Sequence, residues 1–123
     1  MEEIHDRTDG YISVFIPHVE RLYPQHKVIM LVSHAATIIA LIRSLHGDRK
    51  LPVRVGCCSL TELVRKEEKA IGGWEVKKLA DGAHLEGGAP RDWGLEDIEI
   101  AHGKVTVATK VAGLRVLITS PGC

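Results

Sequence analysis

The feature that most constrains the fold is a short apolar run, Val28–Val32, which ends at Ser33 and His34. Five consecutive apolar residues are typical of a strand buried on both faces in a parallel sheet. A helix is predicted directly after the run, because apolar residues recur there at helical spacing and Gly47 can end it in a left-handed backbone conformation. This order of elements favours an α/β architecture with the 28–32 strand inside a sheet.

A second helix is predicted before the run, over roughly residues 12–23. Its apolar positions are Ile12, Phe15, Ile16, Val19, Leu22 and Tyr23. Pro17 must lie near the start of this helix or bend it. No strand is expected before residue 28, although a strand apolar on both faces needs layers above and below it and neighbours beside it. We therefore expect a segment upstream to be absent from this chain, which makes the fold an incomplete three-layer sandwich.

The second half of the chain contains mainly strand signals. The predicted elements are, in order, a strand-rich stretch over Arg54–Arg65, a strand over Trp74–Leu79, a loop over Asp81–Trp93, and strands over Lys104–Thr109 and Leu114–Thr119. The first two are expected to form an antiparallel hairpin, and the last two a second hairpin around Gly113. The sequence thus predicts a mixed sheet with β-hairpin additions.

Length and charge limit the classes of function. The chain has 123 residues, so one domain is the upper limit. Sixteen Lys and Arg residues balance sixteen Asp and Glu residues, and no broad electrostatic field favours nucleic acid or an anionic membrane. The 28–32 run is far too short to cross a bilayer, and the amino terminus is acidic, unlike a secretory signal. We expect no membrane association.

The cysteines indicate a compartment. Cys57, Cys58 and Cys123 are odd in number and two of them are adjacent, which argues against a disulfide framework and for a reducing environment. Cys57 and Cys58 on one alternating strand would be a core thiol and an exposed thiol. A cytoplasmic or nuclear location is therefore predicted.

The junction between the 28–32 strand and the following helix is the best candidate site. Ligands of open α/β sheets bind outside the carboxyl ends of the strands. The N–H groups of Ala35, Ala36 and Thr37 would point out of the helix start, and together with the imidazole of His34 they would suit a phosphate. The alternative is that His34 is a capping or partly buried histidine held by backbone groups.

A series of ordered motifs resembles the histidine phosphatase (phosphoglycerate mutase-like) superfamily. The run 28–35 followed by Leu45-His46-Gly47 resembles its second-histidine motif. The further matches are Pro52–Leu60, Trp74-Glu75-Val76, Asp81–Leu85, Gly87-Gly88 and Arg91–Asp97, and the last three look most like the fungal tau-subunit type of the transcription factor TFIIIC. The resemblance spans about residues 10–98 of a single partial domain, 1–123, and leaves the tail 99–123 unassigned.

The resemblance implies a reaction in which a phosphoryl group passes to a histidine and then to water. Arginines would hold the phosphate oxygens, a second histidine would offset their charge, and a carboxyl group would protonate the leaving oxygen. Only the second histidine has a matching position, His34. His46-Gly47 and His102-Gly103 follow Leu45 and Ala101, so neither forms the Arg-His-Gly motif of the nucleophile. We therefore expect a phosphate-binding half-site without catalysis by this chain alone.

Completed by its missing half, the domain would act on a phosphorylated small molecule or a phosphoprotein. The alternative function is a non-catalytic assembly subunit, similar to the TFIIIC tau subunit, with transcription-complex subunits as partners. The unpartnered strand also predicts exposed apolar surface and self-association.

Two further residues are candidates for phosphate binding. His84 could approach the pocket from the 81–93 loop, and Arg91 is the nearest potential guanidinium anchor there. The alternatives are a solvated loop histidine and an exposed, salt-bridging arginine. No Cys-x-x-Cys, His-Glu-x-x-His or i, i+4 histidine pair occurs, so neither a metal nor another cofactor is expected.

Overall fold

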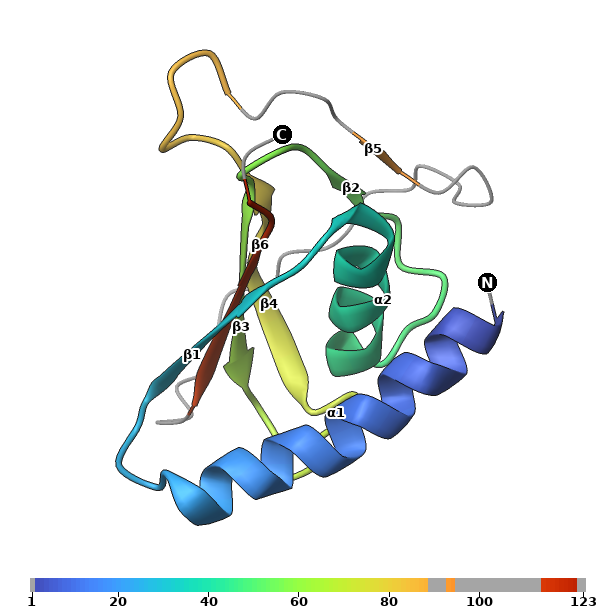
Figure 1. Cartoon of the computed structure of the whole chain (residues 1–123), viewed down its shortest axis with the longest axis vertical. Coiled ribbons are helices and arrows are strands. Elements are labelled where there is room, and N and C mark those ends of the chain that lie inside the picture. Colours follow the sequence, from blue (N-terminus) through green and yellow to red (C-terminus); the bar gives the residue numbers. More distant parts are fainter. Residues whose placement is uncertain (1, 89–92, 95–113, 122–123) are drawn as a thin grey trace.

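A mixed sheet with helices on one face forms the fold of this chain, as shown by a computed structural model that describes residues 2–88, 93–94 and 114–121. The elements are α1 (Glu2–Leu22), β1 (Val28–Val32), α2 (Ala35–His46), β2 (Arg54–Val55), β3 (Leu60–Arg65), β4 (Trp74–Asp81), β5 (Trp93–Gly94) and β6 (Arg115–Thr119). The predicted α/β class is confirmed, and the single helical layer gives an incomplete sandwich (Figure 1).

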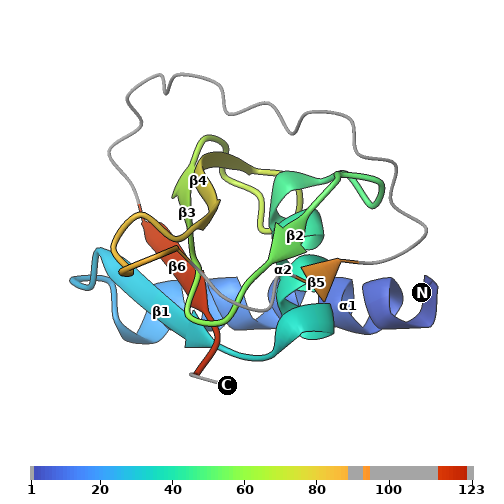
Figure 2. The same ribbon diagram turned by 90° about the horizontal axis from the view of Figure 1, so that it is seen from above.

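The strand order in the main sheet is β1-β6-β3-β4. β1 is parallel to β6, in a register that runs from Val28 opposite Arg115 to Val32 opposite Thr119. β3 is antiparallel to both β6 and β4, and the short β2 and β5 form a separate pair. One neighbour of β1 therefore comes from the far end of the chain and not from an upstream segment (Figure 2).

The core lies between α2 and the sheet. Its fully buried apolar residues include Ile38, Ile39, Ile42 and Leu45 of α2, Leu63, Val116 and Ile118 of the sheet, and Ile12 and Ile16 of α1. α2 ends as predicted at Gly47, whose φ of 90° is the left-handed conformation that glycine adopts without strain. This packing fixes the direction of α2 and therefore the position of its amino end.

α1 is longer than predicted, because it begins at Glu2 instead of near residue 12. Its first turns bury the polar residues His5 and Thr8, which apolar periodicity cannot detect. The Thr8 hydroxyl donates to the Ile4 carbonyl at 2.8 Å, and His5 contacts Arg43 of α2. Pro17 lies inside the helix, far from its start.

Among the described strands β1 lies at the edge of the sheet, and its exposure corrects the prediction of a strand buried on both faces. Val28, Met30 and Val32 are 43%, 57% and 59% exposed, whereas Ile29 and Leu31 are half-buried against the helical side. The reason is that the helices cover one face of the sheet, and the described residues place no layer on the other. An apolar stripe is therefore left open to solvent.

The first predicted hairpin is confirmed, since β3 and β4 pair antiparallel. The 54–65 stretch, however, is divided into β2 and β3 by a turn, in which Cys58 has a φ of 62°. The second hairpin differs from its prediction: β6 has β1 and β3 as neighbours, and the other predicted strand, 104–109, lies outside the described residues.

A charged cluster joins α1 to α2 and the turn after it. Arg49 contacts Glu2, Asp6 and Asp9, each at 2.8 Å. Asp9 also accepts a hydrogen bond of 2.6 Å from the Ser44 hydroxyl. Burial opposes ionisation of Asp9, but the hydrogen bonds from Ser44 and Arg49 outweigh it and lower the pKa of this carboxyl below its ordinary value of 3.8.

We expect this cluster to stabilise the fold at neutral pH and to lose that contribution in acid. A lowered pKa in the folded state contributes stability above pH 3.8, and that stability is lost as the pH falls through the folded-state pKa. Asp9→Asn should therefore flatten the fall in unfolding free energy below about pH 4, as measured by urea denaturation followed by circular dichroism. The matched control is Asp48→Asn, an exposed carboxylate outside the cluster. If the unfolding free energy of Asp9→Asn fell with decreasing pH as steeply as that of the wild-type chain, the lowered pKa of Asp9 would be refuted.

Candidate functional site

His34 is the N-cap residue of α2, with the extended backbone angles φ −128° and ψ 160°. Its carbonyl accepts the first helical hydrogen bond, from the Ile38 N–H at 2.8 Å, while its side chain makes no capping hydrogen bond and is exposed. The alternative of a histidine side chain that caps the helix or is partly buried is therefore wrong. The imidazole is accessible to a ligand from solvent.

Three backbone donors follow His34 in the first turn of α2. Because the first helical hydrogen bond comes from Ile38, the N–H groups of Ala35, Ala36 and Thr37 have no acceptor within α2. Such groups carry the positive end of the helix dipole and favour an anion. Ala35, predicted as a phosphate contact, is thus the first of these donors and is half-buried.

The site lies at the edge of the sheet where the parallel strands β1 and β6 end (Figure 1). The Ser33 N–H donates to the Thr119 carbonyl at 2.8 Å, which joins the start of the His34 junction to the end of β6. The Ser120 hydroxyl in turn accepts from the Cys58 N–H at 3.1 Å. The turn before β3 and the end of β6 are therefore held at the same edge as His34.

His84 belongs to this edge as well. Its Nε2 lies 3.0 Å from the Cys58 carbonyl oxygen. Since a carbonyl can only accept, Nε2 must carry the proton and donate in this contact. The exposed ring thus holds the loop after β4 against the turn before β3, which gives His84 a structural contact at the predicted site. Arg91, the other predicted contact, lies outside the described residues.

A groove of about 510 Å³ lies next to the start of α2, between this helix and α1. Its lining residues are Ile4, Arg7, Thr8, Tyr11, Leu31, Val32, Ser33, Thr37 and Leu41. Arg7, Ser33 and Thr37 are among these lining residues, whereas His34 and Ala35 are not. Sequence reasoning missed Arg7, because the polar first turns of α1 were not predicted as helix. The signal was the spacing of Ile4, Arg7 and Tyr11 on one helical stripe.

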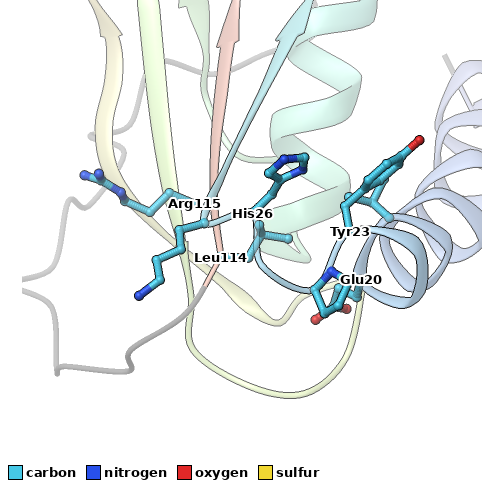
Figure 3. A pocket seen from close by; sticks show the side chains of 8 residues that line it. Glu20, Tyr23, His26, Leu114 and Arg115 are labelled. Atoms are coloured by element: carbon cyan, nitrogen blue, oxygen red, sulfur yellow. The ribbon is translucent and has the colours of Figure 1, made fainter.

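A second hollow, of about 540 Å³, lies at the opposite end of β1 (Figure 3). Glu20 and Arg115 both line it, but each forms an ion pair with another residue. Glu20 binds Arg65 at 2.7 Å, and Arg115 binds Glu62 at 2.9 Å. In the close-up, Arg115 points away from Glu20 and Tyr23. The polar groups do not converge here, so this hollow is not the better candidate for a ligand.

The cysteines differ from their prediction. Cys57 is disulfide-bonded, and Cys58 is a free, half-buried thiol. Both lie in the turn between β2 and β3, not on an alternating strand. The prediction of a core thiol at Cys57 is therefore wrong, and the cytoplasmic or nuclear location stays a prediction.

Two other kinds of feature are absent from the described part of the chain. No group of three or more His, Cys, Asp or Glu side chains could hold a metal ion within it. No helix in the same residues is long and apolar enough to cross a membrane.

Comparison with known proteins gives no relative for this chain: no family model, curated protein or solved structure matches it.

Proposed function

We propose that this chain is the C-terminal part of a histidine-phosphatase-like domain and supplies half of its phosphate pocket. The observation that carries the proposal is the exposed His34, whose side chain does not cap α2. It directly precedes the N–H groups of Ala35 and Ala36, which have no acceptor within α2, at the carboxyl ends of two parallel strands. In a completed pocket, His34 would donate to a phosphate oxygen and offset the charge that develops there during transfer. The backbone donors would fix the orientation of the same oxygens.

The chain does not carry the other groups that the reaction needs. No Arg-His-Gly motif occurs in its sequence, so the nucleophile and its neighbouring arginine would have to come from a further segment. The substrate would be a phosphomonoester, in a small molecule or a phosphoprotein. The leaving-group preference would depend on loops outside this half-site.

We expect inorganic phosphate to bind this chain weakly and to shift the backbone amide resonances of Ala35 and Ala36 in heteronuclear NMR spectra. His34→Ala should abolish most of that shift, because it removes the side-chain donor beside them. The matched control is His26→Ala, an exposed histidine before the opposite end of β1. Shifts of equal size in the wild-type chain and in His34→Ala would contradict the proposal.

The same chain should not hydrolyse p-nitrophenyl phosphate above background, since it lacks the attacking histidine. Robust turnover that disappears in His34→Ala would show that the machinery is complete, and would overturn this part of the proposal. The coding sequence upstream should contain Arg-His-Gly, a second arginine and a later carboxylic acid.

A second candidate function is a non-catalytic assembly subunit, similar to the tau subunit of TFIIIC. The observation that favours it is the open apolar stripe of Val28, Met30 and Val32, a surface suited to a protein partner. In that case the phosphate-induced shifts would be absent, and the upstream sequence would lack the nucleophile motif.

A further inference from the structure

The outer edge of β1 carries no strand among the described residues. β1 pairs with β6 on one side only and forms the end of the strand order. Natural edge strands are usually protected by charged side chains, proline or bulges. The sequence of β1, Val-Ile-Met-Leu-Val, has neither a charge nor a proline, and its pairing with β6 is regular. This edge is therefore suited to pair with another strand.

The hydrogen bonds to β6 show which backbone groups face outward. Lys27 accepts from the Arg115 N–H at 2.9 Å, and the Ser33 N–H donates to Thr119 at 2.8 Å. Along a strand, the N–H and C=O groups of one residue point to the same edge, and successive residues alternate. Odd-numbered residues therefore face β6, and the even-numbered Val28, Met30 and Val32 present their N–H and C=O groups at the free edge.

We propose that this edge is a homodimer interface, in which β1 pairs antiparallel with β1 of a second copy about a two-fold axis at Met30. Val28 then lies opposite Val32 of the partner subunit, and Met30 lies opposite Met30 of the partner subunit. Residues that face each other in this way exchange two hydrogen bonds per pair, so the outward groups of all three residues are satisfied.

This register is the one that uses the whole strand. A shift by one residue would set outward backbone groups of one strand against inward groups of the other. A shift by two would move Val28 opposite His34 of the partner subunit, or Val32 opposite His26 of the partner subunit. At the proposed register the side chains also match: Val28 and Met30 extend the open stripe, and Ile29 lies next to Leu31 of the partner subunit on the helical side. No charged side chain of β1 has to be desolvated.

A stable dimer buries about 1,200–2,000 Å² of surface, so it needs more contact area than two short paired strands provide. The groove beside β1 supplies further apolar surface on the helical side. Its lining includes Ile4 and Tyr11, which are 37% and 48% exposed, together with Leu31. The partner's strand would cover this wall, so the dimer combines backbone pairing with apolar burial.

Sedimentation equilibrium of the whole chain, between about 1 and 100 µM, tests the interface. We expect a monomer–dimer equilibrium, weakened at least about tenfold in Met30→Lys, because two ammonium groups would meet at the axis. The control Val14→Lys places the same charge at a residue of α1 that is 69% exposed, and should leave the equilibrium unchanged. A wild-type chain that stays monomeric throughout, or a dimer unaffected by Met30→Lys, would overturn the proposal.

Cross-linking tests the register, in a Cys58→Ser background that removes the free thiol. In Met30→Cys the two introduced thiols lie on facing residues, with Cα atoms about 5.5 Å apart, a distance that a disulfide spans. In Val28→Cys they lie about 13 Å apart along the strands. Mild oxidation should therefore give a covalent dimer in Met30→Cys and not in Val28→Cys, and the opposite pattern would refute the register. Neither result depends on phosphate binding.

Discussion

Gly73→Ala is expected to destabilise the fold by about 3 kcal/mol, near the upper end for an overpacked site. A Cβ atom at this position would lie 2.2 Å from the Lys69 carbonyl oxygen and 3.0 Å from that of Glu67. Both contacts are with backbone, which cannot rotate away as a side chain can. The Gly73 carbonyl also accepts hydrogen bonds from Lys66 and Glu67, so the turn closes on this residue from two directions.

The measurement is the unfolding free energy from urea denaturation, and Gly10→Ala is the matched control. Gly10 lies in α1, and a Cβ atom added there would meet nothing within 4 Å, so alanine should stabilise the helix by about 1 kcal/mol. The same substitution thus has opposite signs at two sites. Gly73→Ala with wild-type stability would mean that the turn between β3 and β4 adopts another path.

Sequence patterns correctly predicted those elements that depend only on residues near one another in the chain. The uninterrupted apolar run of β1 and the glycine at the end of α2 indicated the correct strand and the correct helix end. The first half of α1 was missed, because His5 and Thr8 occupy buried positions where an apolar pattern expects Ile or Leu. His5 has its partner, Arg43, in α2, which is distant in sequence.

Non-local pairing was the other limit. β6 lies between β1 and β3, although more than eighty residues separate it from β1 along the chain. No local signal in the 115–119 segment distinguishes this position from one strand of a hairpin. The exposure of Val28, Met30 and Val32 follows from the same arrangement, since an edge strand with helices on one side cannot bury both faces.

The candidate site was predictable to the extent that it depends on one junction. A strand that leads directly into a helix must place His34 at the helix start, whatever the rest of the sheet does. Arg7 and the contact between His84 and Cys58 depend on the long-range packing of α1 and of the loop after β4. The position of His34 therefore follows from the local sequence, whereas the residues around it are placed by contacts between segments distant in sequence.

Arg43→Met is expected to destabilise the fold by about 2–6 kcal/mol, because it leaves two buried groups unsatisfied at about 1–3 kcal/mol each. Arg43 is 2% exposed. Its Nε donates to the Leu51 carbonyl at 3.0 Å, and its Nη1 lies 3.2 Å from His5 Nε2, which must accept because a guanidinium cannot. One side chain thus ties α2 both to α1 and to the segment that follows it.

Arg49→Met is the control, since Arg49 is partly exposed and its contacts with Glu2 and Asp6 are open to solvent. It should cost about 1 kcal/mol or less. A double-mutant cycle of Arg43→Met with His5→Leu should give a coupling energy of about 0.5–3 kcal/mol, and strictly additive effects would refute the buried contact. Because α2 carries His34 at its amino end, Arg43→Met should also weaken the phosphate-induced shift at Ala35, although Arg43 lies at the other end of the helix.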